Sequence, residues 1–134
     1  MQALFAAYHS SLVALFVLAA LVILQSLIAD VAGIRAKHVP GMPVTDGHKS
    51  FFFRAVRAHG NSYENLGLFL LLVLVCLFAG ASVTWVRNWI WVFVAARAAH
   101  MACYYADLRT ARSAAFTAGV VAELGLLGCA YMAL

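Results

Sequence analysis

The sequence is poor in charge, and this shortage excludes a soluble globular domain. Charged residues make up 10% of its 134 residues, whereas soluble domains carry about 25%. Hydrophobic residues reach 66%, which is more apolar surface than one soluble core of this size can bury. Lipid is therefore the solvent that suits the composition. The net charge of +4 comes without the basic and aromatic surface pattern of nucleic-acid binders, so we expect no nucleic-acid partner.

Proline, cysteine and early basic residues are also scarce. The two prolines both lie in residues 37–47, which predicts a loop there. The three cysteines lie in apolar segments without metal-ligand spacing, and we interpret them as packing residues. No Lys or Arg precedes Arg35, so the first apolar run lacks the basic start of a signal peptide. We expect this run to be a retained membrane helix.

Four long, largely apolar segments predict an all-α, integral membrane four-helix bundle, with residues 1–134 as one domain. The expected helices cover residues 4–35, 48–79, 84–107 and 111–134. Thr45 or Asp46 is the expected N-cap of the second helix. Basic residues flank the first and third loops, which predicts that these loops are cytosolic and that both termini lie on the other side.

Two stripes of polar residues interrupt the apolar segments. The spacings of 3, 4 and 3 residues place the members of each stripe within an arc of about 80° on one helix face. The first stripe is Arg54, Arg57, Asn61 and Glu64. The second stripe is Arg97, His100, Tyr104 and Asp107. Ionisable groups on membrane helices normally face a bundle interior or a wet cavity and pair with one another.

Two interpretations of the stripes stay open. The polar residues could only hold helices together, for which a single Arg–Glu pair would suffice. The arginines outnumber the acids, however, and this excess favours a site for a small anion that enters from the cytosol. A hydrophobic substrate could reach the same site from the bilayer. His59, His100, Glu64 and Asp107 lack the paired spacing of a metal site, so we expect no metal.

The residues of these stripes resemble those of the MAPEG family, which includes microsomal glutathione transferases, leukotriene C4 synthase and microsomal prostaglandin E synthase. The run RAVRAHGNSYEN at residues 54–65 is similar to the family signature, an Arg followed at fixed offsets by Asn and Glu. Residues 97–104 and the pair Arg112-Ser113 resemble two further family segments. The four-helix layout extends the resemblance over the whole chain.

The resemblance implies a twelve-helix homotrimer that binds glutathione, as cosubstrate, between neighbouring subunits. Catalytic roles would fall to Arg112, which would stabilise the glutathione thiolate, and to Ser113. The implied glutathione-binding residues are Arg35, Arg57, His59, Asn61, Glu64, Asn65, His100 and Tyr104.

Three positions depart from the family pattern. Phe53 stands where many members carry an acid, and Gly60 where some carry a basic residue. Phe116 replaces a Tyr of some members, so no hydroxyl at this position can assist the thiolate. These departures argue against a specialised eicosanoid enzyme.

The function expected from the resemblance is a membrane glutathione transferase that conjugates hydrophobic electrophiles from the bilayer, with peroxidase activity towards lipid hydroperoxides as an associated reaction. The main alternative is a non-catalytic protein of the same fold that binds a lipid or small amphiphile. A transporter or channel is a weaker alternative, because the sequence shows no broken helix or inverted repeat.

Overall fold

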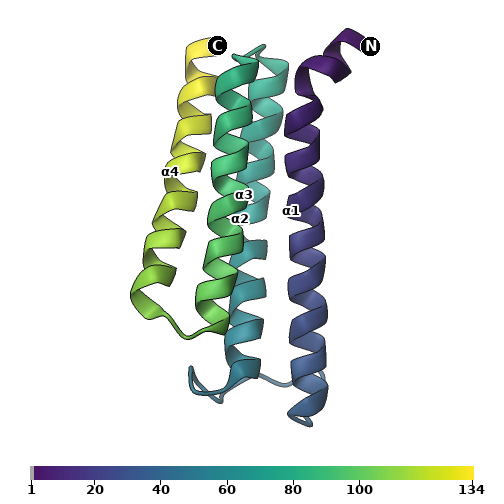
Figure 1. The fold of residues 1–134 in the computed structure, drawn as a ribbon, viewed down its shortest axis with the longest axis vertical. Helices are drawn as coiled ribbons and strands as arrows, with labels where there is room; N and C mark the ends of the chain where they lie inside the picture. Colours follow the sequence, from purple (N-terminus) through teal and green to yellow (C-terminus); the bar gives the residue numbers. More distant parts are fainter. Residues whose placement is uncertain (1) are drawn as a thin grey trace.

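A computed structural model describes residues 2–134, with side chains from residue 6 onward, and these residues form four helices (Figure 1). The helices are α1 (Gln2–Arg35), α2 (Phe51–Phe78), α3 (Val83–Tyr105) and α4 (Arg109–Ala133). They run alongside one another, with the α1–α2 and α3–α4 loops at one end and the α2–α3 turn at the other. The expected all-α, four-helix architecture is confirmed.

Within residues 2–134, three helices are long and apolar enough to cross a membrane, namely α1, α2 and α4. The third helix, α3, has 23 residues, which corresponds to a length of about 35 Å and so to the thickness of a bilayer core. Two of its polar side chains, Arg97 and His100, are buried in the bundle. That α3 crosses the membrane with the other three helices stays a prediction.

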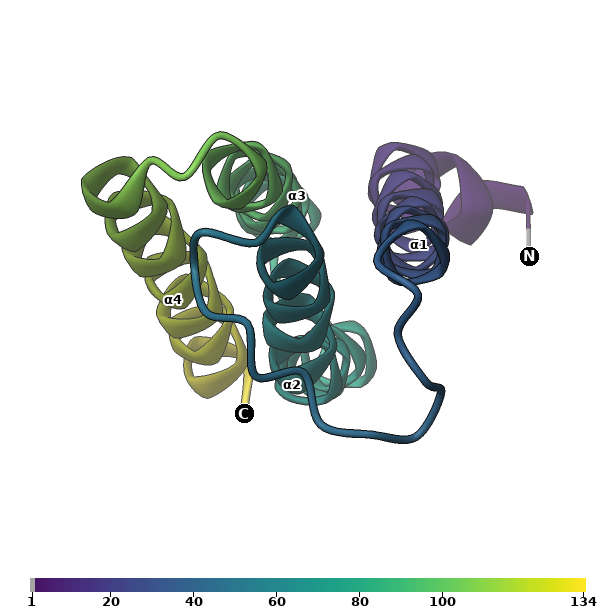
Figure 2. The ribbon, with the colours of Figure 1, turned by 90° about the horizontal axis from the view of Figure 1, so that it is seen from below.

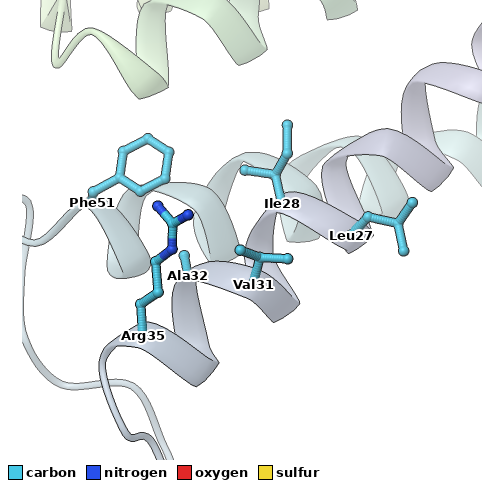
Figure 3. A pocket seen from close by; sticks show the side chains of 6 residues that line it. All are labelled: Leu27, Ile28, Val31, Ala32, Arg35 and Phe51. Atoms are coloured by element: carbon cyan, nitrogen blue, oxygen red, sulfur yellow. The ribbon is translucent and has the colours of Figure 1, made fainter.

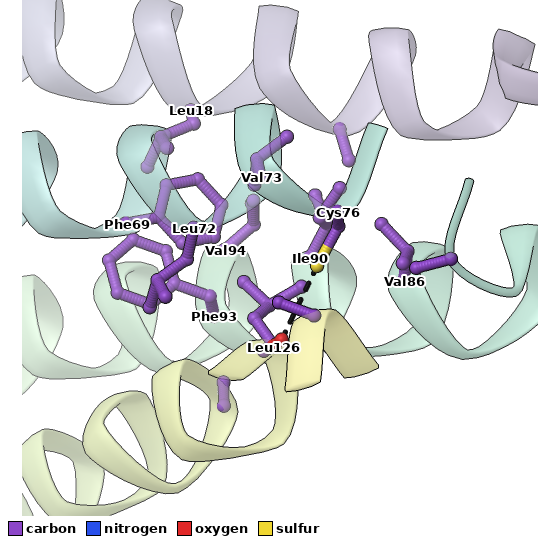
Figure 4. Packing of buried hydrophobic residues seen from close by; sticks show 14 residues of the cluster. Leu18, Phe69, Leu72, Val73, Cys76, Val86, Ile90, Phe93, Val94 and Leu126 are labelled. Atoms are coloured by element: carbon purple, nitrogen blue, oxygen red, sulfur yellow. Dashed lines mark hydrogen bonds between the residues drawn. The ribbon is translucent and has the colours of Figure 1, made fainter. Parts of the chain in front are cut away.

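The bundle is open, because α1 and α4 do not pack against each other within the described chain. In the view along the bundle, α2 and α3 lie in the centre, with α1 on one side and α4 on the other (Figure 2). The centre is filled by apolar side chains. Phe69 of α2 stacks on Phe93 of α3 with their ring centroids 3.9 Å apart, and Cys76 donates through Sγ to the Leu126 carbonyl at 3.3 Å (Figure 4).

Glycines allow α3 and α4 to approach each other closely. A Cβ at Gly125 would collide with the indole of Trp89, and one at Gly119 would lie 2.7 Å from Nη2 of Arg97. Small residues at helix interfaces are typical of membrane bundles, where close packing replaces the hydrophobic effect as the force between helices. The helices α3 and α4 therefore pack closely around the Arg97 side chain.

The N-cap prediction for the second helix was wrong, because the helix begins later than expected. Ser50 is the N-cap, and its Oγ accepts from the backbone N–H of Phe53 at 3.4 Å. A turn precedes it, with Gly47 at φ +74° and the Ser50 N–H bonded to the Gly47 carbonyl at 3.1 Å. This turn leaves Thr45 and Asp46 outside the helix.

Asp107 also differs from the prediction, because it does not belong to the stripe on α3. The helix ends at Tyr105, and Asp107 adopts a left-handed conformation with φ 55°. The Leu108 N–H then bonds to the Cys103 carbonyl at 2.8 Å, which closes the helix end in a Schellman-type turn. The Asp107 carboxylate instead lies 4.0 Å from Nε of Arg109, at an exposed corner.

Candidate functional site

The stripe on α2 divides between the interior and the surface of the chain. Asn61 is partly buried, and its Oδ1 accepts from Nη1 of Arg97 at 3.0 Å. Arg57 and Glu64, one turn to either side of Asn61, are exposed. The exposed face therefore presents a cation and an anion on either side of a buried polar contact.

Arg97 is the largest buried polar side chain of the interior. It is 1% exposed, and its guanidinium carbon lies 5.5 Å from the Phe93 ring centroid and 5.7 Å from that of Phe116. Gly119 leaves the space that the guanidinium fills. A buried arginine requires hydrogen bonds or a counter-charge, and Asn61 supplies one of these.

Glu123, an acid that the sequence reasoning missed, lies on the facing helix and forms no ion pair within 4.0 Å of Arg97. It lies one turn after Gly119 on α4, so both face Arg97, and its charge interacts with the Arg97 guanidinium. The side chain is 7% exposed, and its Oε1 has no hydrogen-bond partner among the described residues. The available signal was the isolation of this acid within the apolar part of residues 111–134.

A second group of polar side chains gathers at the loop end of α3 and α4. The guanidinium carbon of Arg112 lies 4.4 Å from the ring centroid of Tyr104, which is itself buried. The His100 ring meets the same Tyr104 ring edge-on, with centroids 5.0 Å apart. The structure thus brings together the predicted site residues Arg112, Tyr104 and His100.

His48, in the loop before α2, joins this group and was not predicted as a site residue. Its Nδ1 lies 3.4 Å from Nη1 of Arg112, and its ring stacks over Tyr104 with centroids 6.2 Å apart. Little in the sequence singled it out, because it was expected at the start of a helix. Only the path of the α1–α2 loop, which passes beneath α2 towards α4, places it there (Figure 2).

Arg54 has a structural role and does not belong to the site. Its Nη1 donates to the carbonyls of His48 at 2.6 Å and Lys49 at 3.2 Å, and its Nη2 to the carbonyl of Tyr105 at 3.4 Å. The guanidinium thus joins the end of the α1–α2 loop to the end of α3. Because it binds backbone atoms, Arg54 fixes the position of His48.

The other predicted site residues have no hydrogen bond or ring contact with the Arg112, Tyr104 or His100 side chains in the described chain. Arg35 lies at one end of an apolar pocket of about 270 Å³ between α1 and Phe51 (Figure 3). Ser113 is exposed and its hydroxyl donates to the Arg109 carbonyl at 3.2 Å, within its own helix. His59 is partly buried next to Tyr63, with ring centroids 6.3 Å apart. Asn65 donates to the Asn61 carbonyl at 2.7 Å.

The charges of the site are largely uncompensated by acids. Among the side chains that the structure describes, the one ion pair within 4.0 Å is that of Asp107 and Arg109. Arg57 and Arg112 therefore have no carboxylate at that distance. No three His, Cys, Asp or Glu side chains of the described part form a metal-ligand group. The arrangement can bind an anion at two places, at exposed Arg57 and at Arg112 on the loop end.

Comparisons with known proteins identify a family but no individual relative. The model of the MAPEG family matches residues 11–132, nearly the whole chain. The match contains both polar stripes, Glu123 and the group around Arg112. No curated protein matches the chain.

Proposed function

Because this chain belongs to the MAPEG family and is an integral membrane protein, we propose that it is a membrane-bound glutathione transferase. In this proposal the glutathione thiolate attacks a hydrophobic electrophile that reaches the site from the bilayer. The observation that carries the proposal is the position of Arg112, a half-buried cation held against the Tyr104 ring without a carboxylate within 4.0 Å among the described residues.

Arg112 would promote the reaction through its charge. A free thiol has a pKa of about 8.5, and a nearby cation lowers it, so more of the bound cosubstrate is the nucleophilic thiolate at neutral pH. Arginine stays charged throughout the accessible pH range, which makes it an electrostatic stabiliser of the thiolate and not a base. The same thiolate could reduce a lipid hydroperoxide, which is the peroxidase activity that we include in the proposal.

The exposed face of α2 would hold the peptide part of glutathione. Glutathione carries two carboxylates and one ammonium group. Arg57 can bind a carboxylate through two parallel hydrogen bonds, and Glu64 can accept from the ammonium. Both side chains are exposed on the single chain. Their exposure leaves them accessible to a neighbouring subunit, and we propose that glutathione binds there, between the subunits of a homotrimer.

The orientation in the membrane is also part of the proposal. Both loops that carry the basic residues lie at the same end of the bundle, as the His48–Arg112 contact requires. We place this end in the cytosol, since cytosolic loops are rich in Lys and Arg. Glutathione would then enter from the cytosol, and both termini would face the opposite side.

Isothermal titration of glutathione into the detergent-solubilised protein tests the proposal, with Arg57→Ala and Glu64→Ala measured in parallel. We expect binding in the micromolar-to-millimolar range that both variants weaken at least tenfold, because each removes one charge-assisted contact. Lys37→Ala, a change at an exposed loop residue, is the control and should bind as the wild type does. Absence of wild-type binding at several millimolar glutathione, together with retention of a co-purified lipid, would favour the lipid-binding alternative.

A further inference from the structure

We propose that His48 accepts the proton of the thiol at the Arg112 site, so that it acts as the general base of the proposed transferase. This inference rests on the proposed function and deepens it. Arg112 can stabilise a thiolate but cannot remove a proton, because a guanidinium has no free lone pair to act as acceptor. The reaction therefore requires a separate proton acceptor, either the solvent or a neighbouring side chain.

The contact between the two residues pairs a donor with an acceptor. Arginine offers only N–H donors, so at the 3.4 Å contact His48 Nδ1 is the acceptor. This contact uses the tautomer whose ring proton is on Nε2. The unprotonated nitrogen consequently points at Arg112, which is where the sulfur of a thiol stabilised by Arg112 would lie.

The position of the His48 ring is fixed on several sides. Its plane stacks on Tyr104 from α3, and Phe53 from α2 meets it edge-on with centroids 5.2 Å apart. Arg54 binds the carbonyl of His48 itself at 2.6 Å. A base held in this way is ready for proton transfer without rearrangement of the loop.

The charged groups around His48 favour a thiolate over a thiol. Arg112 faces the ring from α4, and Arg54 of α2 donates to the His48 carbonyl, while Lys49, the next residue in the loop, is exposed. Asp46, two residues earlier in the loop, is exposed. Tyr104 is the titratable group that faces His48 from α3. A negative sulfur would thus sit among cations, which offsets the cost of placing an imidazolium beside Arg112.

The proposed proton transfer needs no reactant besides the thiol and His48. The thiol displaces the Arg112–His48 hydrogen bond, its sulfur accepts from the guanidinium, and its S–H donates to Nδ1. The S–H bond breaks, the electron pair stays on sulfur and an N–H bond forms at Nδ1. The thiolate then forms a bond to the electrophilic carbon while the bond from that carbon to its leaving group breaks, and the leaving group takes the electron pair. The imidazolium returns its proton to water or to this leaving anion.

The His48→Asn variant distinguishes a role of His48 as general base from a role as hydrogen-bond acceptor alone. The Asn side-chain oxygen can take the place of Nδ1 as acceptor for Arg112, but it cannot take up a proton near neutral pH. His38→Asn is the matched control, since His38 lies in the same loop, partly buried, and bonds to the Met42 carbonyl at 3.0 Å. The measurements are glutathione binding, absorbance of the bound thiolate, and kcat/KM for a standard aromatic electrophile from pH 6 to pH 9.

We expect His48→Asn to bind glutathione as well as the wild type but to lose at least tenfold in kcat/KM and most of the thiolate signal at pH 7. The loss should shrink towards pH 9, where glutathione ionises without a base because a free thiol has a pKa of about 8.5. A His48→Asn variant with wild-type kcat/KM and thiolate signal at pH 7 would overturn the inference while leaving the transferase intact. A wild type that neither binds nor turns over glutathione would overturn both.

Discussion

Three arginines, Arg54, Arg97 and Arg112, occupy three different environments, although the sequence presents them alike. Arg54 donates to three backbone carbonyls and joins a loop to a helix end. Arg97 is buried, with Asn61 as hydrogen-bond partner and with Glu123 nearby on α4. Arg112 rests on an aromatic ring with no acid within 4.0 Å in the described part. Of these three, Arg112 is the one whose guanidinium is neither fully buried nor bound to backbone carbonyls, so it is the one placed to bind a ligand anion.

Replacement of Arg112 by Ala should lower kcat/KM for glutathione conjugation by about 10²-fold at pH 7, the effect of removing one preorganised electrostatic contact to a developing anion. Arg109→Ala is the control at the same helix start, because the Arg109 side chain is 70% exposed and pairs only weakly with Asp107. The measurement is the initial rate of conjugation in detergent micelles. Full activity of Arg112→Ala at neutral pH would contradict the mechanism.

Phe116 shows how a departure from the family pattern affects the site. Its ring lies 6.2 Å from that of His100 and 5.7 Å from the guanidinium carbon of Arg97. It therefore packs within the polar group and contributes no hydroxyl. The absence of a hydroxyl at this position is consistent with a site that depends on Arg112, and in our proposal on His48, for thiolate formation.

At the scale of the elements, the helix ends were harder to predict than the helices. The apolar runs predicted the four segments, and the observed helices agree with them to within three residues at each end. The N-cap of α2 and the end of α3 were wrong, because Gly47 and Asp107 adopt left-handed conformations that form turns outside the helices. Hydrophobic patterning contains no information on such turns.

The N-cap of α2 gives a test at this scale. Ser50→Ala should lower the free energy of unfolding by about 1 kcal/mol, because it removes the side-chain acceptor of the Phe53 N–H. Ser82→Ala is the matched control, since Ser82 occupies the N-cap position of α3 without a side-chain hydrogen bond to that helix. Thermal unfolding in one detergent, followed by circular dichroism, compares the two. Equal losses of stability would show that the Ser50 cap contributes nothing.

At the scale of the molecule, the single chain leaves much apolar surface without a protein partner. Phe16, Ile23, Phe78 and Tyr131 are between 61% and 89% exposed. Lipid can cover such side chains, but it cannot satisfy exposed charges such as Arg57 and Glu64 at the side of α2. Because α1 and α4 do not contact each other, the bundle of the described chain is not closed.

If the chain forms the homotrimer that we propose from the family resemblance, native mass spectrometry from detergent should detect a species of three chains of 14.4 kDa each. Arg57→Ala should keep this trimer if its role is to bind glutathione, and addition of glutathione should add one to three ligand masses to the wild type only. A protein that stays monomeric over a range of gentle detergents would contradict the trimer proposal and with it the site between subunits.

The sequence by itself determined the membrane class, the four helices, the two stripes and the family resemblance, which the family match then confirmed. These features depend on local composition and periodicity, which can be read along the chain. The tertiary structure alone showed that Asn61 bonds to Arg97, that Glu123 faces Arg97, and that His48 meets Arg112. Each of these contacts joins residues on different elements. They depend on the path of the α1–α2 loop and on the glycines that let α3 and α4 pack closely. Periodicity along the sequence specifies neither feature.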